Sequence, residues 1–142
     1  MKGRVLAVDY GGRRTGLAVS DPLRIVASPL PPIDSRSLEE TVAAVAAVVR
    51  EREVRVVVVG MPYLPSGLEG EQCARVRLFL SSLREALPEG VAVESLDERF
   101  TTREAERLLR PTGRRRRELK EHIDSTAAVV LLRDYLGSGG VD

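Results

Sequence analysis

The chain has 142 residues, 43% of them hydrophobic and 30% charged, which is ordinary for one globular domain with a core of its own. No apolar run approaches the roughly 20 residues of a membrane span, which excludes a transmembrane protein. A single cysteine and a single histidine exclude an intramolecular disulfide and the usual zinc sites. We therefore expect one domain over residues 1–142, located in the cytoplasm, in which any metal is held by oxygen, as Mg²⁺ and Mn²⁺ are.

The net charge of +1 hides a strongly basic segment. Residues 110–120 hold six basic residues and one acidic residue, a charge of +5, which leaves −4 for the rest of the chain. A basic patch on an otherwise acidic chain favours local contact with a polyanion. A solvated loop is the alternative interpretation of such a run.

The first elements form a predicted β-hairpin. Residues 4–9 and 15–20 are short apolar runs rich in β-branched side chains, separated by Tyr-Gly-Gly-Arg-Arg. A third strand is expected at 25–27. The proline-rich SPLPPID that follows is expected to end it, because proline cannot donate a hydrogen bond to a ladder.

The rest of the chain alternates between helical and strand patterns. Spacing, caps and turn residues predict a helix over 37–52, a strand over 54–60, a loop over 61–70, a helix over 71–87, a strand over 91–96, a short helix over 101–109 and a final helix over 117–136. Strand-helix-strand units imply right-handed parallel crossovers. The predicted fold class is α/β, with a mixed sheet of about five strands flanked by helices.

Acidic residues stand at the ends of two predicted strands. Asp9 ends an apolar strand immediately before Gly11 and Gly12, where glycine lets a substrate or a metal approach closely, although an ordinary hairpin turn explains this pattern equally well. Glu98 follows Asp97 at the end of another strand, and only one of two adjacent residues on an extended segment faces a given site. The residues alone leave the choice between these two carboxylates open, and a solvated ion pair with the next arginine is a third reading.

Asp124 lies in the predicted final helix among mostly apolar residues. Helical steps of four and three place it at the border of the apolar stripe, beside Ala128 and Leu131. An ionised carboxylate there is costly unless it is paired with an arginine, hydrogen-bonded or bound to a metal. If Asp9, Glu98 and Asp124 meet, their repulsion calls for a divalent cation, and two such cations can activate water for attack on a phosphodiester.

Arginines and glycines near these acids are candidate contacts for phosphate groups. One group follows Asp9 in the turn, and the other precedes the helix of Asp124. The predicted substrate-binding residues are Gly11, Gly12, Arg13, Arg114, Arg115, Arg116 and Arg117.

Four segments of the chain resemble the YqgF/RuvX family, in order and from about residue 4 to residue 136: VDYGGRRTGLAVSD, VVVVGMP, DERFTT and HIDSTAAVVLLRDYL. The resemblance implies a ribonuclease H-like fold distantly related to the junction resolvase RuvC. It also implies that Asp9, Glu98 and Asp124 are the catalytic and metal-binding carboxylates, and so selects Glu98 over Asp97.

The same resemblance implies maturation of the 5′ end of the 16S ribosomal RNA precursor, or, in an older proposal, resolution of Holliday junctions. No motif here separates these substrates. One departure from the family lies after Gly60, where Pro65-Ser66-Gly67 stands in place of the Asp or Asn before glycine that related proteins often have.

Three function classes are compatible with these patterns. The leading one is a nuclease dependent on Mg²⁺ or Mn²⁺, acting on ribosomal RNA precursor or on branched DNA. An actin-like phosphotransferase also opens with a strand, Asp-x-Gly and a hairpin, but its nucleotide lies between two domains, and 142 residues supply one. The third is a non-catalytic nucleic-acid-binding module. No heptad seam is present, so we expect a monomer or weak homodimer with no membrane partner.

Overall fold

The computed structural model describes residues 2–97 and 116–137, with side chains in the last helix described from residue 126 onward. Five strands form one sheet in the order β3-β2-β1-β4-β5. The elements are β1 (Arg4–Asp9), β2 (Arg14–Ser20), β3 (Ala27–Asp34), α1 (Leu38–Glu51), β4 (Val54–Met61), α2 (Glu71–Ala86), β5 (Ala92–Asp97) and α4 (Arg116–Gly137).

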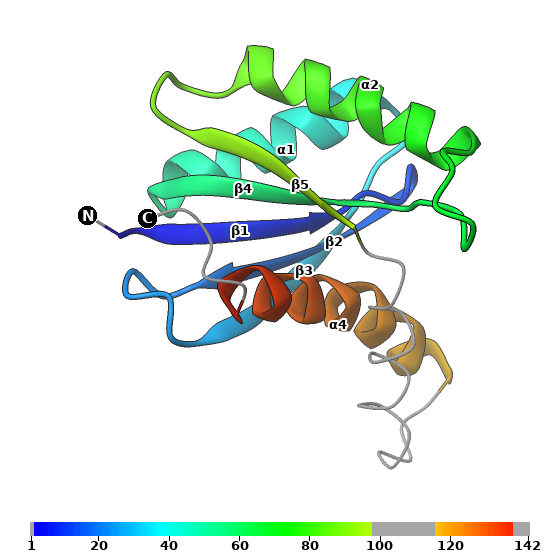
Figure 1. Ribbon diagram of the computed structural model, residues 1–142. Coiled ribbons are helices and arrows are strands. Elements are labelled where there is room, and N and C mark those ends of the chain that lie inside the picture. Colours follow the sequence, from blue (N-terminus) through cyan, green and yellow to red (C-terminus); the bar gives the residue numbers. More distant parts are fainter. Residues whose placement is uncertain (1, 98–115, 138–142) are drawn as a thin grey trace.

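The sheet is mixed, as the sequence predicts. Strand β1 is antiparallel to β2, and β2 is antiparallel to β3, whereas β1, β4 and β5 run parallel to one another. Helices α1 and α2 cover one face of the sheet and α4 covers the other (Figure 1). The predicted α/β class is confirmed. The predicted short helix over 101–109 lies outside the described residues.

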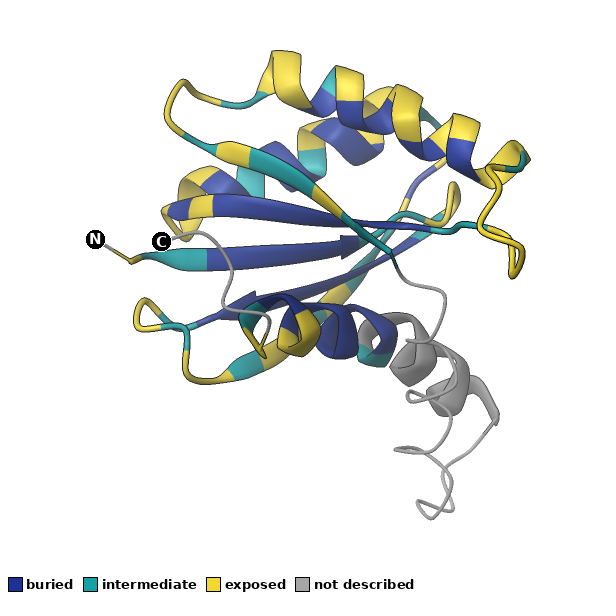
Figure 2. Ribbon diagram, viewed as in Figure 1, coloured by how far each residue is buried: buried dark blue, intermediate teal, exposed yellow. Residues whose placement is uncertain are grey.

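Two hydrophobic clusters sandwich the sheet, and strand alternation assigns each side chain to one of them. On β1, Leu6 and Val8 belong to the cluster under α1 and α2, while Val5 and Ala7 belong to the cluster under α4. Figure 2 shows the central strands buried between the two helical layers. This explains why β1 and β4 are almost continuously apolar in sequence, since both of their faces are covered.

The third strand, β3, begins at Ala27 and includes the proline-rich segment. The predictions of a strand over 25–27 and of its end at these prolines were therefore wrong. Strand β3 is at the edge of the sheet and needs to hydrogen-bond with β2 alone, and an edge strand tolerates proline. The register also shifts here, because Thr15 pairs with Ile33 and Leu17 pairs with Leu30. Pro31 and Pro32 fall between these pairs, at an irregularity like a β-bulge. The regular hydrogen bonds between the strands are interrupted there, so proline is tolerated.

The first helix has a side-chain cap at its start. The Ser37 hydroxyl accepts a hydrogen bond from the Glu40 backbone N–H at 3.1 Å, which satisfies one of the donors that a helix start leaves without an internal partner. Among the described residues, no helix is long and apolar enough to cross a membrane.

The turn between β2 and β3 is held by one carboxylate. Asp21 Oδ1 accepts hydrogen bonds from the backbone N–H groups of Ile25 and Val26, each at 2.7 Å. The Val26 N–H is the main cause that lowers the pKa of Asp21 below its ordinary value of 3.8, and the Ile25 N–H acts in the same direction. Because the pKa is lower in the folded state, Asp21 stabilises the fold above about pH 4, and this contribution is lost as the pH falls through the folded-state pKa.

We predict that Asp21→Asn lowers the Tm at pH 7, and that the difference from the wild type narrows as the pH falls below the ordinary value of 3.8. Thermal unfolding followed by circular dichroism between pH 2 and pH 7 would measure it. The control is Leu23→Asn in the same turn, a side chain that is 63% exposed and does not titrate. A constant gap between Asp21→Asn and the wild type across this range would contradict the assignment.

Candidate active site at the carboxyl ends of the parallel strands

Asp9 is the last residue of β1 and is half-buried. Because Val5 and Ala7 belong to the cluster under α4, alternation puts Asp9 on the same face of the sheet. Asp9 therefore presents a carboxylate at the carboxyl end of a central strand, on the side that α4 covers. In α/β sheets, ligands bind at the carboxyl ends of the strands.

Glycine stands beside Asp9 on both neighbouring strands. Gly16 of β2 is paired directly with Asp9, and Gly60 of β4 follows Val59, which pairs with Val8. Both glycines are buried, and neither has a side chain to fill the space next to the carboxylate. Sequence reasoning missed this feature, because only the strand register shows that the two glycines flank the same residue.

The turn after Asp9 needs glycine at two positions for structural reasons. A Cβ on Gly11 would lie 2.0 Å from the backbone oxygen of Arg14, and Gly12 has a φ of +76°. The Arg13 N–H donates to the Gly11 carbonyl at 2.9 Å. Backbone geometry alone therefore accounts for both glycines, and their predicted contact with substrate stays a prediction.

Strand β5 is parallel to β1, so its carboxyl end lies at the same end of the sheet as Asp9. Asp97, however, is on the opposite face of the sheet from Asp9. Leu96 packs on the cluster under α4, and the Tyr135 hydroxyl of α4 donates to Glu94 Oε2 at 2.9 Å. Val93 packs on the other cluster, so alternation puts Asp97 on the side of α1 and α2. Asp97 and Asp9 thus lie on different sides of the sheet. Glu98 is outside the described residues.

Helix α4 crosses the sheet in the direction opposite to β1, and it begins on the side of the molecule toward which β1 points (Figure 1). Its backbone includes position 124, one turn before Ala128, although the side chain of Asp124 is outside the described part. The side of the helix that packs on the sheet consists of Ala128, Val129, Leu131, Leu132 and Tyr135. The buried face of the helix is broader than a single apolar stripe, because all residues from 127 to 132 are buried.

The sequence predicts that the whole arginine run precedes the last helix. In the structure, part of the run is inside the helix. Helix α4 begins at Arg116, so Arg116 and Arg117 are in its first turn. This position suits arginine less than an acidic residue, because the helix dipole presents partial positive charge there. Arg114, Arg115 and the side chains of the whole run lie outside the described part of the chain.

The loop over residues 62–70, which departs from the family pattern, leaves β4 at this same edge. An ion pair between Glu69 and Arg77 ties it to α2, and the hydrogen bond from Arg77 lowers the pKa of Glu69. The Cys73 thiol donates to the Pro62 carbonyl at 3.4 Å. The loop is thus fastened to α2 at both of its ends.

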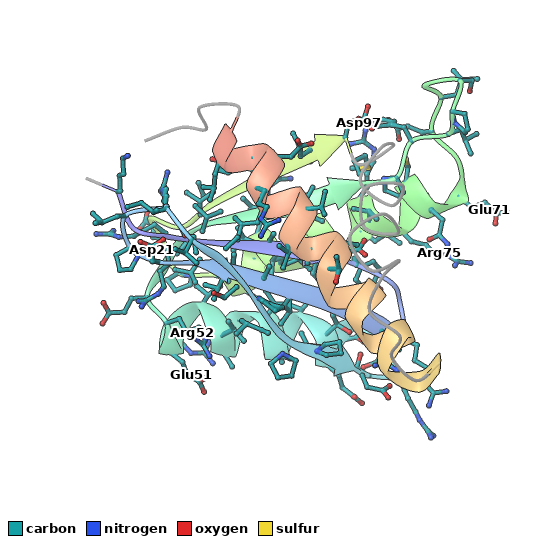
Figure 3. The ribbon with its side chains drawn as sticks, turned by 90° about the horizontal axis from the view of Figure 1, so that it is seen from below. Asp21, Glu51, Arg52, Glu71, Arg75 and Asp97 are labelled. Carbon is teal, nitrogen blue, oxygen red and sulfur yellow. The ribbon has the colours of Figure 1, made fainter. Side chains whose placement is uncertain are left out.

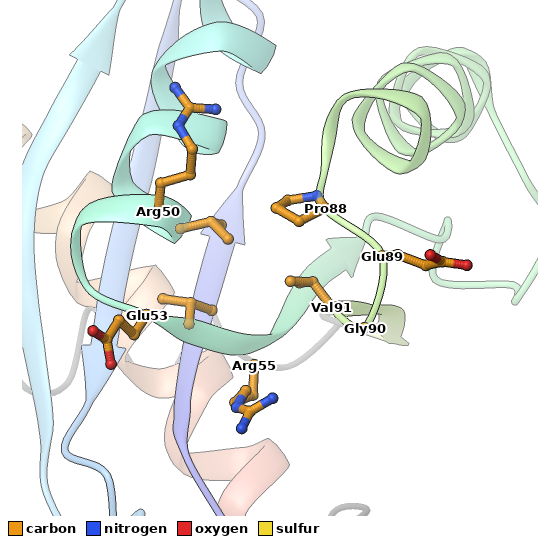
Figure 4. Close-up of a pocket in the computed structure, with 9 residues that line it drawn as sticks. Arg50, Glu53, Arg55, Pro88, Glu89, Gly90 and Val91 are labelled. Carbon is orange, nitrogen blue, oxygen red and sulfur yellow. The ribbon is translucent and has the colours of Figure 1, made fainter.

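A pocket lies at the opposite end of the parallel strands, near the start of β4. It has a volume of about 310 Å³ and is lined by residues that include Arg50, Glu53, Arg55 and Glu89 (Figure 4). Figure 3 shows how far apart the two ends of the molecule are. Asp97 and Glu71 lie at one end, and Asp21 and Glu51 lie at the other. The pocket is therefore distinct from the edge where Asp9 lies.

Asp9 fits a site for a hard cation in chemistry and in placement. Carboxylate oxygen is a preferred ligand of Mg²⁺ and Mn²⁺, and the flanking Gly16 and Gly60 add no side chain beside it. Within residues 2–97 and the described side chains of α4, no group of three or more His, Cys, Asp or Glu could hold a metal ion. The other two predicted ligands, Glu98 and Asp124, lie outside that part.

A family model described as RuvX, Holliday junction resolvase, matches residues 3–138 of the chain. The chain belongs to the RuvX family. This membership confirms the predicted family and the predicted class of enzyme, a nuclease. The match of a resolvase family over nearly the whole chain also favours a nuclease over the phosphotransferase alternative.

Relatives of this RuvX protein carry a more specific name. A protein of Chloroflexus aggregans named "Putative pre-16S rRNA nuclease" is 41% identical over 132 residues, which cover 93% of this chain and 92% of that protein. A protein of Koribacter versatilis with the same name is 39% identical over 142 residues, covering 99% and 90% of the two chains.

Two solved structures share the fold. RuvC of T. thermophilus in complex with a Holliday junction has a TM-score of 0.62 at 16% identity and covers 96% of each chain. The Fowlpox virus resolvase with Holliday junction DNA has a TM-score of 0.58 at 13% identity, covering 95% and 97%. At these identities the likeness shows the fold alone, which is the predicted ribonuclease H-like fold.

The two turn glycines should differ in how well they tolerate a side chain. We predict that Gly12→Ala costs about 1–2 kcal/mol, the usual penalty for a left-handed residue. Gly11→Ala should cost more, because its Cβ would lie 2.0 Å from a backbone oxygen. Urea unfolding of both variants provides the free energies of unfolding. Equal losses at the two positions would contradict the turn geometry.

Proposed function

We propose that this RuvX protein is a metal-dependent nuclease that processes the 5′ end of the 16S ribosomal RNA precursor in the cytoplasm. The observation that carries the proposal is the half-buried carboxylate of Asp9 at the carboxyl end of β1, flanked by Gly16 and Gly60 on the face under α4. The names of the relatives supply the substrate.

The proposed catalytic carboxylates are Asp9, Glu98 and Asp124. Asp9 is supported by its position in the sheet. Glu98 is supported by the family resemblance and by the alternation of β5, which leaves Asp97 on the opposite face from Asp9. Asp124 is supported by its place in α4, one turn before Ala128, which is buried against the sheet.

These three carboxylates are also the proposed ligands of Mg²⁺ or Mn²⁺. The bound cations would supply an activated water and neutralise charge at the phosphate. The contribution of the chain is to hold carboxylates at fixed positions. Asp9 does this from a strand paired on both sides, and such a support is more rigid than a loop.

We predict that Asp9→Asn abolishes cleavage while RNA affinity in EDTA stays unchanged, because the amide keeps the size of the side chain but is a poor metal ligand. The Tm in metal-free buffer should stay equal or rise slightly, since one member of a repelling cluster becomes neutral. Gel assays of precursor cleavage, anisotropy binding and thermal unfolding measure the three quantities.

The matched control is Asp134→Asn, which removes an exposed carboxylate from α4 and should leave cleavage intact. Full activity of Asp9→Asn at saturating Mg²⁺ would refute its role as a ligand. A large loss of Tm would instead assign Asp9 a structural role in the hairpin.

A junction resolvase is the second candidate, and the description of the family favours it. Paired cuts in opposing strands require a two-fold dimer with both sites on one junction, whereas trimming one RNA end requires one site. We propose a monomer or weak dimer that cuts RNA. Digestion of precursor RNA and of a four-way DNA junction, side by side with sedimentation, distinguishes the candidates. A stable dimer that makes paired cuts in the junction would favour the resolvase. The paired cuts should then disappear when the active protein is mixed with excess Asp9→Asn protein.

The arginine run from Arg114 to Arg117 is proposed to bind phosphates of the substrate. We predict that replacing all four arginines by alanine weakens binding more than it slows the chemical step. On single-stranded RNA, the slope of log affinity against log salt should fall by up to roughly 0.7 for each phosphate that the run neutralises in the wild type. Anisotropy titrations at several salt concentrations provide this slope, and an unchanged slope would make the run a solvated segment.

A further inference from the structure

Arg14 begins β2 on the same face of the sheet as Asp9. Gly16 is paired with Asp9, and Ala18 lies in the cluster under α4, so alternation puts Arg14 on this face as well. Arg14 is half-buried. In an antiparallel pair, a residue two positions from the direct partner is a diagonal neighbour within reach of a long side chain. Arg14 is that neighbour of Asp9.

Arg13, which the sequence analysis selects for substrate binding, has a different setting. Its side chain is 71% exposed, and its Nε lies 3.4 Å from Asp34 Oδ1 at the surface. Exposed ion pairs of this kind contribute little to stability. Arg13 is in the turn, and its charge is directed toward Asp34. Arg14 is in the strand, where Asp34 of β3 is its direct partner and Asp9 of β1 is its diagonal neighbour.

We propose that Arg14 contacts a phosphate of the RNA strand bound at Asp9 and thereby positions that strand for cleavage. This inference rests on the proposed nuclease function. A guanidinium carries donors in a planar fork that matches two phosphate oxygens at once. Partial burial strengthens this contact relative to one made in bulk water. Gly16 and Gly60 put no side chain of their own beside Asp9 on this face.

A purely structural ion pair between Arg14 and the carboxylates is the competing explanation. The two explanations differ in what happens when Asp9 is already neutral and no metal is present. If Arg14 acts only on Asp9, its replacement in an Asp9→Asn background leaves RNA affinity unchanged. If it contacts phosphate, its replacement weakens binding there too.

The experiment compares Arg14→Gln, Arg14→Lys and Arg13→Gln, each alone and combined with Asp9→Asn. The control is Arg55→Gln, which makes the same charge change at an exposed position on the opposite edge. RNA affinity is measured by anisotropy in EDTA, where cleavage does not occur. Cleavage is measured in single turnovers with Mg²⁺ and with the protein in saturating excess over the RNA. Thermal unfolding reports whether each variant is folded.

We expect Arg14→Gln to weaken RNA binding in the Asp9→Asn background by about tenfold, as the loss of a charged hydrogen bond implies. Arg14→Lys should keep part of the affinity but reduce the cleavage rate, because an ammonium group lacks the planar fork. Arg13→Gln should have smaller effects than Arg14→Gln in both assays, and Arg55→Gln should match its parent.

Unchanged affinity of Arg14→Gln in the Asp9→Asn background, with the wild type active, would overturn the inference and leave the nuclease function standing. If Arg14→Gln fails to fold, Arg14→Lys decides: wild-type affinity and rate in that variant would also overturn it. A wild type that cleaves no RNA would refute the proposed function instead.

Discussion

The burial of β1 on both faces is the constraint on which the rest of the structure depends. A strand covered by helices on each side must be apolar at successive positions, and Val5 to Val8 meet this requirement with no exposed surface. Polar groups can enter only where the strand ends. Asp9 is that first polar residue, and the alternation that sends Ala7 toward α4 sends Asp9 the same way. The position of the carboxylate is therefore a consequence of how the core is built.

Two glycines lie beside Asp9, so the neighbouring strands place no side chain next to its carboxylate. Glycine within a strand weakens it, because it packs no side chain and loses more backbone entropy on folding. Two such residues beside a single carboxylate are a cost to the sheet: Gly16 is the direct partner of Asp9, and Gly60 follows the partner of Val8. The cost is consistent with a requirement for space at this point. A hairpin turn would require Gly11 and Gly12 but would place no demand on Gly16 or Gly60.

The elements with strong local signals could be predicted from the sequence. The capping hydroxyl of Ser37 and the apolar spacing that follows it define α1, and the continuous valine run defines β4. The extent of strand β3 could not be predicted, because its prolines are permitted only by its position at the edge of the sheet, which is a property of the assembled topology. The same limit applies to the site. Asp9 could be identified as a candidate from its neighbours, but register alone distinguishes Arg14 from Arg13 and pairs Asp9 with Gly16.

Helix α4 couples the second core cluster to the candidate site. Its described half packs on β1, β2 and β4 through Ala128, Leu131 and Leu132, and the hydroxyl of Tyr135 is bonded to Glu94 of β5. These contacts determine the rotation of the helix about its axis. A helix is rigid over a few turns, so the rotation at Ala128 also applies one turn earlier, at position 124. The packing that stabilises the fold thereby sets the direction from which α4 approaches the carboxyl end of β1, and core and site are not independent parts of this molecule.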